Sequence, residues 1–76
     1  MPKFYVESTT SHALIIDRPN AELAARSLIL LNPDMVYEYM KSKTDVYICV
    51  NENGFGGQLR TDMIFSLEEL INKKEH

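Results

Sequence analysis

All three glycines of this chain lie within four residues of one another, directly after an apolar stretch. A glycine loop can bind phosphate through its backbone amides when a helix begins directly after it and a lysine follows. Here the polar segment 58–62 leads to another apolar run, which favours a turn, and Asn-Gly is itself a strong turn signal. The pattern therefore predicts a hairpin loop made of Asn53, Gly54, Phe55, Gly56 and Gly57.

Pro2 offers a second kind of chemistry, because loss of Met1 would leave a secondary amine at the chain terminus. Small enzymes of the tautomerase family use such a proline as a general base, and Phe55-Gly56-Gly57 is similar to their glycine-rich hairpin. That family has an arginine just after the first strand, where this chain has Ser8-Thr9-Thr10, and an extra strand precedes the first helix here. A tautomerase-like enzyme that uses Pro2 is therefore the alternative function.

Cys49 and His12 are the remaining candidates for catalysis, as a nucleophile and its base. Cys49 lies within an alternating apolar run, where a free cysteine is usually a small apolar residue. His12 lies beside a polar turn, where we expect water around it. The spacing of histidines and carboxylates is not that of a metal site. We therefore predict no catalytic residue, no metal and no cofactor.

The length of 76 residues is enough for one small domain, residues 1–76, and the apolar fraction of 45% is that of a globular protein. The net charge is −3 and lysines and arginines do not cluster, so a nucleic-acid partner is not expected. A single cysteine excludes an internal disulfide and favours a reducing, cytoplasmic location. We expect neither a signal peptide nor a membrane span.

The first half of the chain predicts a hairpin followed by a helix. Lys3–Ser8 and His12–Asp17 alternate as strands and are joined by a short polar break, which favours antiparallel pairing. Asn20 then caps a helix over Ala21–Leu31. We expect one stripe of this helix to face the sheet, formed by Ala21, Ala24, Ala25, Leu28 and Leu31.

Leu23 and Leu30 fall on the other side of this helix, with Ser27 between them. Two explanations are open: the next segment covers them, or they contact another subunit. We favour the first, since consecutive elements usually pack together.

The second half predicts two more strands and a capped helix. Asn32-Pro33 caps a segment over Pro33–Lys41, either a short helix with Met35, Val36, Tyr39 and Met40 on one side or a structured loop. The remaining elements are strands Asp45–Glu52 and Met63–Phe65, a capping box from Ser66 to Glu69, and a helix Leu67–Lys74. The order ββα(α)ββα predicts an α+β fold, a two-layer sandwich with about four antiparallel strands and the helices on one face.

The face of the sheet away from the helices is the predicted contact surface. If Val6, Ile48 and Val50 face the helices, the alternation places Tyr5, Glu7, Ala13, Ile15, Tyr47 and Cys49 on the open side. That set is too apolar for a fully solvated surface. A one-residue shift in register would reverse the assignment.

Four stretches of the chain form a familiar series: Phe4-Tyr5-Val6-Glu7-Ser8, Ala21 with Ala24-Ala25, the segment 50–55, and Ile64-Phe65-Ser66 followed by Leu67-Glu68-Glu69-Leu70. Together they resemble a loose group of small, uncharacterised bacterial and phage proteins. Leu67 stands where that group usually has threonine, and the segment Pro33–Lys41 is longer than usual. The resemblance implies a common fold and brings no known activity.

The function we expect is binding of another protein, either a second copy as a homodimer or a host protein that a phage or bacterial modulator would act on. Tyr5, Ile15, Tyr47 and Cys49 are the interface candidates on the sheet, and Leu23 and Leu30 are those on the helix. Exposed tyrosines are typical of protein contacts. Neither nucleic acid nor a membrane is an expected partner.

Overall fold

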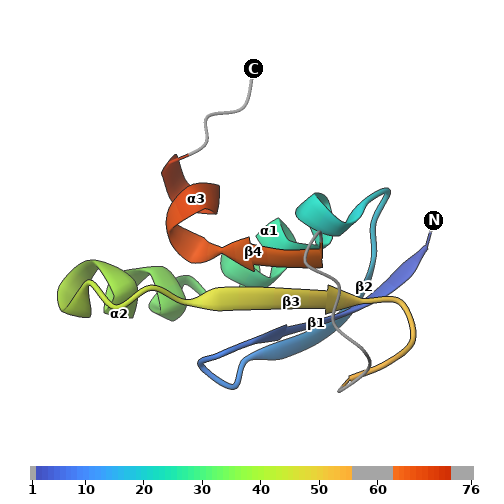
Figure 1. Ribbon diagram of the computed structural model, residues 1–76, viewed down its shortest axis with the longest axis horizontal. Coiled ribbons are helices and arrows are strands. Elements are labelled where there is room, and N and C mark those ends of the chain that lie inside the picture. Colours follow the sequence, from blue (N-terminus) through green and yellow to red (C-terminus); the bar gives the residue numbers. More distant parts are fainter. Residues whose placement is uncertain (1, 56–62, 73–76) are drawn as a thin grey trace.

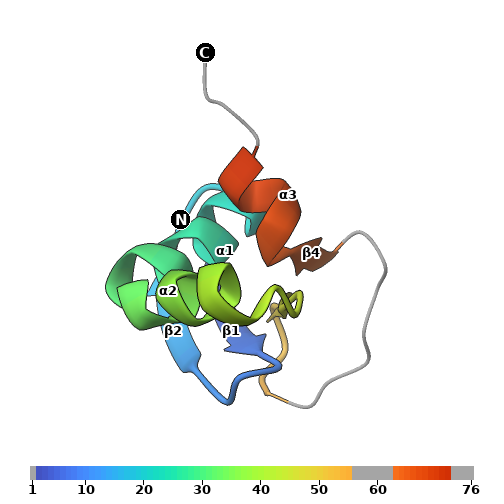
Figure 2. The same ribbon diagram turned by 90° about the vertical axis from the view of Figure 1, so that its left-hand side faces the viewer.

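The computed structural model describes residues 2–55 and 63–72. Within them the elements are β1 (Lys3–Ser8), β2 (Ala13–Asp17), α1 (Ala21–Leu31), α2 (Pro33–Ser42), β3 (Tyr47–Asn51), β4 (Ile64–Ser66) and α3 (Leu67–Asn72). The strands form one antiparallel sheet in the order β2-β1-β3-β4. The helices of this part of the chain lie on one side of that sheet, which confirms the predicted two-layer α+β fold (Figure 1, Figure 2).

The sheet register places the apolar core between the strands and the helices. Val6 is opposite Leu14 on one side and Val50 on the other, and Ile48 is opposite Phe65. Because side chains alternate along a strand, these residues share the helix-facing side. The core comprises Phe4, Val6, Ala24, Ala25, Leu28, Met35, Val46, Ile48, Val50, Leu67 and Leu70.

Helix α1 begins as predicted and packs on β1, β2 and β3. The Asn20 side chain accepts a hydrogen bond from the N–H of Leu23 at 3.0 Å, which satisfies one orphan amide of the first turn. Ala24 and Ala25 are fully buried, and their small side chains allow the helix axis to approach the sheet.

Two expectations about the faces of α1 are wrong, those for Leu31 and for Leu30. Leu31, the last residue of the helix, is 61% exposed, because helical periodicity fixes a side chain's direction and not the extent of the surface opposite. Ser27 is buried, since its hydroxyl accepts from Nε of Arg18 at 2.9 Å and donates to the carbonyl of Leu23 at 2.9 Å. Leu30 is 79% exposed, so the interpretation that the next segment covers it is also wrong.

The segment after α1 is a helix, which decides between the two alternatives left by the sequence. Pro33 is at its start, as predicted, but Asn32 makes no side-chain cap for it and instead donates to the carbonyl of Leu28. Met35 is buried, whereas Met40 is 54% exposed and does not join the predicted apolar side. The helix ends at Ser42, and the cap residue Lys43 has a left-handed φ of 62° and donates its N–H to the carbonyl of Tyr39.

The last two strands and α3 are joined through Asp45. Strand β3 is shorter than predicted, because Asp45 precedes it and turns its carboxylate toward α3. Strand β4 is Ile64–Ser66, one residue later than predicted. The predicted capping bond from Glu69 N–H to the Ser66 hydroxyl is long, at 3.5 Å. The described part of α3 ends at Asn72; the predicted Lys73 and Lys74 lie outside the described residues.

Candidate protein-binding surface

The sheet register brings four of the predicted interface residues to one face. Tyr5 is opposite Ile15, Glu7 is opposite Cys49, and Tyr47 is opposite Ser66. All of these lie on the side away from the helices because they alternate with the buried strand residues. We call this side of the sheet the open face.

The open face carries apolar and aromatic side chains. Ile15 is 52% exposed and Tyr47 is 49% exposed, while Tyr5 is half-buried. Phe55 follows the turn after β3 and packs edge-on against Tyr5, with ring centroids 5.3 Å apart. Phe55 was predicted only as a loop residue, and its contact with Tyr5 depends on a turn path that spacing does not reveal.

The loop after β3 is a tight turn within the described residues. The N–H of Asn53 donates to the side-chain oxygen of Asn51 at 2.8 Å, and Gly54 has a φ of 114°. That φ is strongly unfavourable for a residue with a Cβ atom, which explains the glycine. Gly56 and Gly57 lie outside the described residues.

Cys49 is on the open face but is a poor nucleophile. Burial raises the pKa of its thiol, and the carboxylate of Glu7 raises that pKa further. Less thiolate is therefore present at neutral pH than for a free cysteine. His12 does not pair with Cys49; its Nδ1 lies 2.7 Å from the Thr10 hydroxyl and its Nε2 lies 3.2 Å from the Asp34 carboxylate.

The turn between β1 and β2 contains a hydrogen-bond chain that sequence reasoning missed. The Ser8 hydroxyl is 2.6 Å from that of Thr10, which is 2.7 Å from Nδ1 of His12, and Nε2 of His12 is 3.2 Å from Asp34. This order is that of a nucleophile, a base and its orienting carboxylate. The sequence signal was only Ser-x-Thr-x-His, because Asp34 comes from α2.

The same turn lacks the donors that acyl transfer requires. The N–H groups of Ser8, Thr9, Thr10, Ser11 and His12 all donate to acceptors within the chain. None of these five amides is therefore available to stabilise an oxyanion beside Thr10. We interpret this chain of hydrogen bonds as structural: it fixes the conformation of the turn and connects the turn to α2.

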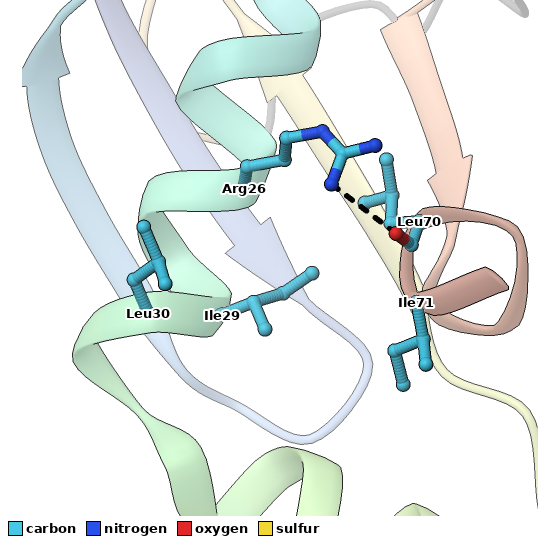
Figure 3. Close-up of a pocket in the computed structure, with 5 residues that line it drawn as sticks. All are labelled: Arg26, Ile29, Leu30, Leu70 and Ile71. Carbon is cyan, nitrogen blue, oxygen red and sulfur yellow. Dashed lines mark hydrogen bonds between the residues drawn. The ribbon is translucent and has the colours of Figure 1, made fainter. Parts of the chain in front are cut away.

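The predicted helix candidates lie on a second surface. Leu30 lines a hollow of about 350 Å³ between α1 and α3, together with Arg26, Ile29, Leu70 and Ile71 (Figure 3). Arg26 and Ile29 extend from α1 toward α3, and Nη1 of Arg26 donates to the carbonyl of Leu70 at 3.2 Å. Leu23 is not among the lining residues. We call this hollow the helix groove.

The guanidinium of Arg26 already has anionic and carbonyl partners, including Glu22 at 3.4 Å. It therefore links α1 to the carboxyl end of α3, where a cation is favourable. The helix groove is apolar apart from this group. Its chemistry fits an apolar side chain better than an anion.

A second hollow, of about 440 Å³, lies between the β1–β2 turn, α2 and the start of β3. Its lining includes Thr10, Glu38, Tyr39 and Asp45. Burial raises the pKa of Tyr39, and the charges of Glu68 and Asp45 add to this effect. Both oxygens of the Asp45 carboxylate already accept hydrogen bonds, from Ser66 and from the N–H of Glu68.

Pro2, the candidate of the alternative function, is exposed just before β1. Its carbonyl accepts from the N–H of Arg18, which extends the β1–β2 ladder by one pair. The Arg18 guanidinium is bound by Ser27 and by the carbonyl of Asp17.

Residues 2–55 and 63–72 contain no group of three or more His, Cys, Asp or Glu side chains that could hold a metal ion. In the same part of the chain no helix has the length and apolar character to cross a membrane. Comparisons with protein-family models, with curated proteins and with solved structures found no match.

Proposed function

We propose that this chain is a small protein-binding domain that contacts its partner with the open face. The supporting observation is that Tyr5, Ile15 and Tyr47 share the side of the sheet that none of the described helices covers, with Phe55 packed against Tyr5. Half-exposed aromatic and aliphatic side chains on one face are typical of protein contacts.

The charges on the open face define the chemistry of the partner. Glu7 is exposed beside Tyr5 and opposite the half-buried Cys49. Lys3 and Asp17 face each other at one end, so their charges offset. The partner we propose has an apolar patch with a lysine or arginine at its centre, placed to meet Glu7.

The resemblance to small bacterial and phage proteins makes a host protein of a bacterium the partner class to search, with this chain as its modulator. A second copy is the other partner proposed for this chain. The helix groove is the second candidate surface, since Leu30 is the most exposed large apolar residue among those described.

The test is affinity capture from a bacterial lysate with two matched tyrosine variants. Tyr47→Asp places a charge on the open face, and Tyr37→Asp places the same charge on α2, where Tyr37 is also exposed. Wild type and Tyr37→Asp should recover the same partner, and Tyr47→Asp should lose it. Glu7→Lys should weaken recovery by charge reversal.

Equal recovery by Tyr47→Asp and wild type, or recovery of no partner by wild type, would overturn the proposal. Circular dichroism of each variant shows that the fold is retained. A Leu30→Asp variant that alone loses the partner would move the contact to the helix groove.

A further inference from the structure

Strand β2 is an edge strand with an unused side. It is terminal in the order β2-β1-β3-β4, and among the described residues it pairs with β1 alone (Figure 2). Its sequence, Ala-Leu-Ile-Ile-Asp, is apolar and well suited to a strand. An edge of this kind is a template for pairing with another chain.

The register shows which backbone groups face outward. The N–H of Ser8 donates to the carbonyl of His12, and that of Arg18 donates to the carbonyl of Pro2. His12 and Arg18 thus belong to hydrogen-bonded pairs with β1. Every second pair of an antiparallel ladder is hydrogen-bonded, so Leu14 and Ile16, which lie two and four residues after His12, also bond with β1. Ala13, Ile15 and Asp17 therefore direct their N–H and carbonyl groups away from the sheet.

We infer that a second copy of this chain pairs along β2, antiparallel and centred on Ile15. In this register Ile15 is opposite Ile15 of the second copy, and Ala13 is opposite Asp17. All outward backbone groups of β2 then meet a partner. The product is a two-fold symmetric dimer with one continuous sheet. This inference goes beyond the open-face proposal and does not depend on the identity of that partner.

The side chains of β2 complement each other in the same register. Leu14 and Ile16 are both only partly buried on the helix side, and here they become opposite one another. Ile15 meets its copy on the open face, beside Tyr5 of each chain. Every apolar side chain of the edge thus gains a cross-strand neighbour.

Charge selects this register over a shifted one. Centring the pairing on Asp17 would place two carboxylates opposite each other, which is unfavourable. Centring on Ile15 places each Asp17 opposite Ala13. The Asp17 carbonyl accepts from Nη1 of Arg18 at 2.9 Å through one lone pair, and its second lone pair remains for the N–H of Ala13 in the other copy. Pro19 lies beyond Asp17, so the pairing stops there.

Disulfide trapping tests the register. Three single cysteine variants, Ile15→Cys, Ala13→Cys and Asp17→Cys, are made in a Cys49→Ala background, which removes the native thiol. A hydrogen-bonded antiparallel pair separates its Cα atoms by about 5.5 Å, a distance that a disulfide spans. Ile15→Cys should therefore form a covalent dimer on mild oxidation.

In the proposed dimer, two copies of Ala13→Cys have their thiols about 14 Å apart along the strand. This variant alone should therefore form no covalent dimer in a non-reducing gel. Mixed with Asp17→Cys it should cross-link. Absence of the Ile15→Cys dimer, or equal cross-linking by all single variants, would overturn the inference. Cross-linking at Ile15 without cross-linking in the mixture would overturn the register.

Sedimentation of the chain without introduced cysteines tests the dimer itself. Wild type should have twice the chain mass at high concentration. Ile15→Pro removes the outward N–H and leaves the Leu14 and Ile16 bonds to β1, so it should halve the mass. Tyr37→Asp, an exposed change on α2, should keep the wild-type mass.

A wild type that stays monomeric at every concentration would overturn this inference. It would leave the open-face proposal standing, because capture by that face is measured through Tyr47 on β3. If Tyr47→Asp recovers the same partner as wild type while the chain still dimerises, the open-face proposal is overturned and the inference about β2 stands.

Discussion

Oδ1 of Asp45 accepts a hydrogen bond from the main-chain N–H of Glu68 at 3.2 Å, across 23 residues of sequence. Oδ2 of the same carboxylate accepts from the Ser66 hydroxyl at 2.6 Å. The loop before β3 thus caps helix α3, and the Leu67 N–H adds a bond to the carbonyl of Val46 at 2.7 Å. A cap from outside the helix ties β4 and α3 to the central strand.

Replacement of this carboxylate should therefore destabilise the fold. We expect Asp45→Ala to lower the free energy of unfolding by about 1–2 kcal/mol, the usual cost of a lost helix cap. Asp34→Ala is the matched control, because the Asp34 carboxylate is exposed and contacts His12 at the surface; its loss should cost less than about 1 kcal/mol. Urea denaturation measures both. Equal losses would contradict the role of Asp45.

The contribution of Asp45 should depend on pH. Burial alone would raise its pKa, but hydrogen bonds from Ser66, Glu68 and Val46 outweigh this and hold the pKa below the ordinary 3.8. The charged form is thus favoured in the folded state. The resulting stability is fully present above pH 3.8 and is lost as the pH falls through the lower folded pKa.

Urea denaturation of wild type and Asp45→Asn between pH 7 and about pH 2 checks this sign. The stability difference between them should shrink as the solution becomes acidic. A difference that stays constant, or grows, would show that the charge of Asp45 does not stabilise the fold.

The buried hydroxyl of Ser27 should contribute more to the stability of the fold than its position outside the predicted buried stripe of α1 suggests. Ser27→Ala leaves Nε of Arg18 without its acceptor, and we expect a loss of about 1–3 kcal/mol. Ser42→Ala, at the exposed end of α2, should change stability by less than about 0.5 kcal/mol. Thermal unfolding compares the two. A neutral Ser27→Ala would show that the Arg18 contact contributes nothing.

Lys43 offers a stabilising substitution. Its φ of 62° is left-handed, a conformation that glycine adopts without strain from a Cβ atom. Lys43→Gly should raise the free energy of unfolding by about 0.5–1 kcal/mol. Lys41→Gly, two residues earlier and inside α2, should lower it by about 1 kcal/mol. The same sign for both would refute the argument from φ.

The thiol of Cys49 should react slowly with alkylating reagents at neutral pH. Burial and the charge of Glu7 both raise its pKa, so Glu7→Gln should lower that pKa and speed alkylation. The pH dependence of the alkylation rate measures the change. Glu52→Gln, outside the sheet, removes the same charge and should leave the rate unaltered. Identical profiles for wild type and Glu7→Gln would exclude the influence of Glu7.

The alternation of side chains predicted the strands and the open face well. Phe4 and Val6 are buried where Tyr5 and Glu7 are not, because a strand has only two faces and burial of one fixes the other. The faces of α1 were less predictable. Ser27 is buried although it is polar, since a distant arginine satisfies its hydroxyl.

The candidate surfaces also fall into two groups, those that strand alternation predicted and those that it did not. Tyr5, Ile15, Tyr47 and Cys49 were found by period alone and lie on one face. The helix groove needed α3 beside α1, and the His12–Asp34 contact needed α2 beside a turn. Neither pairing leaves a periodic signal, because each joins segments far apart in sequence.

The sequence by itself determined the strands, the helices and which side chains share a face, because these depend on local periodicity and on capping residues such as Asn20. Only the tertiary structure decided the strand order, which leaves β2 at the edge, and the cap that Asp45 provides to α3. Both are contacts between distant segments. Their positions follow from how the core packs, which no local pattern encodes.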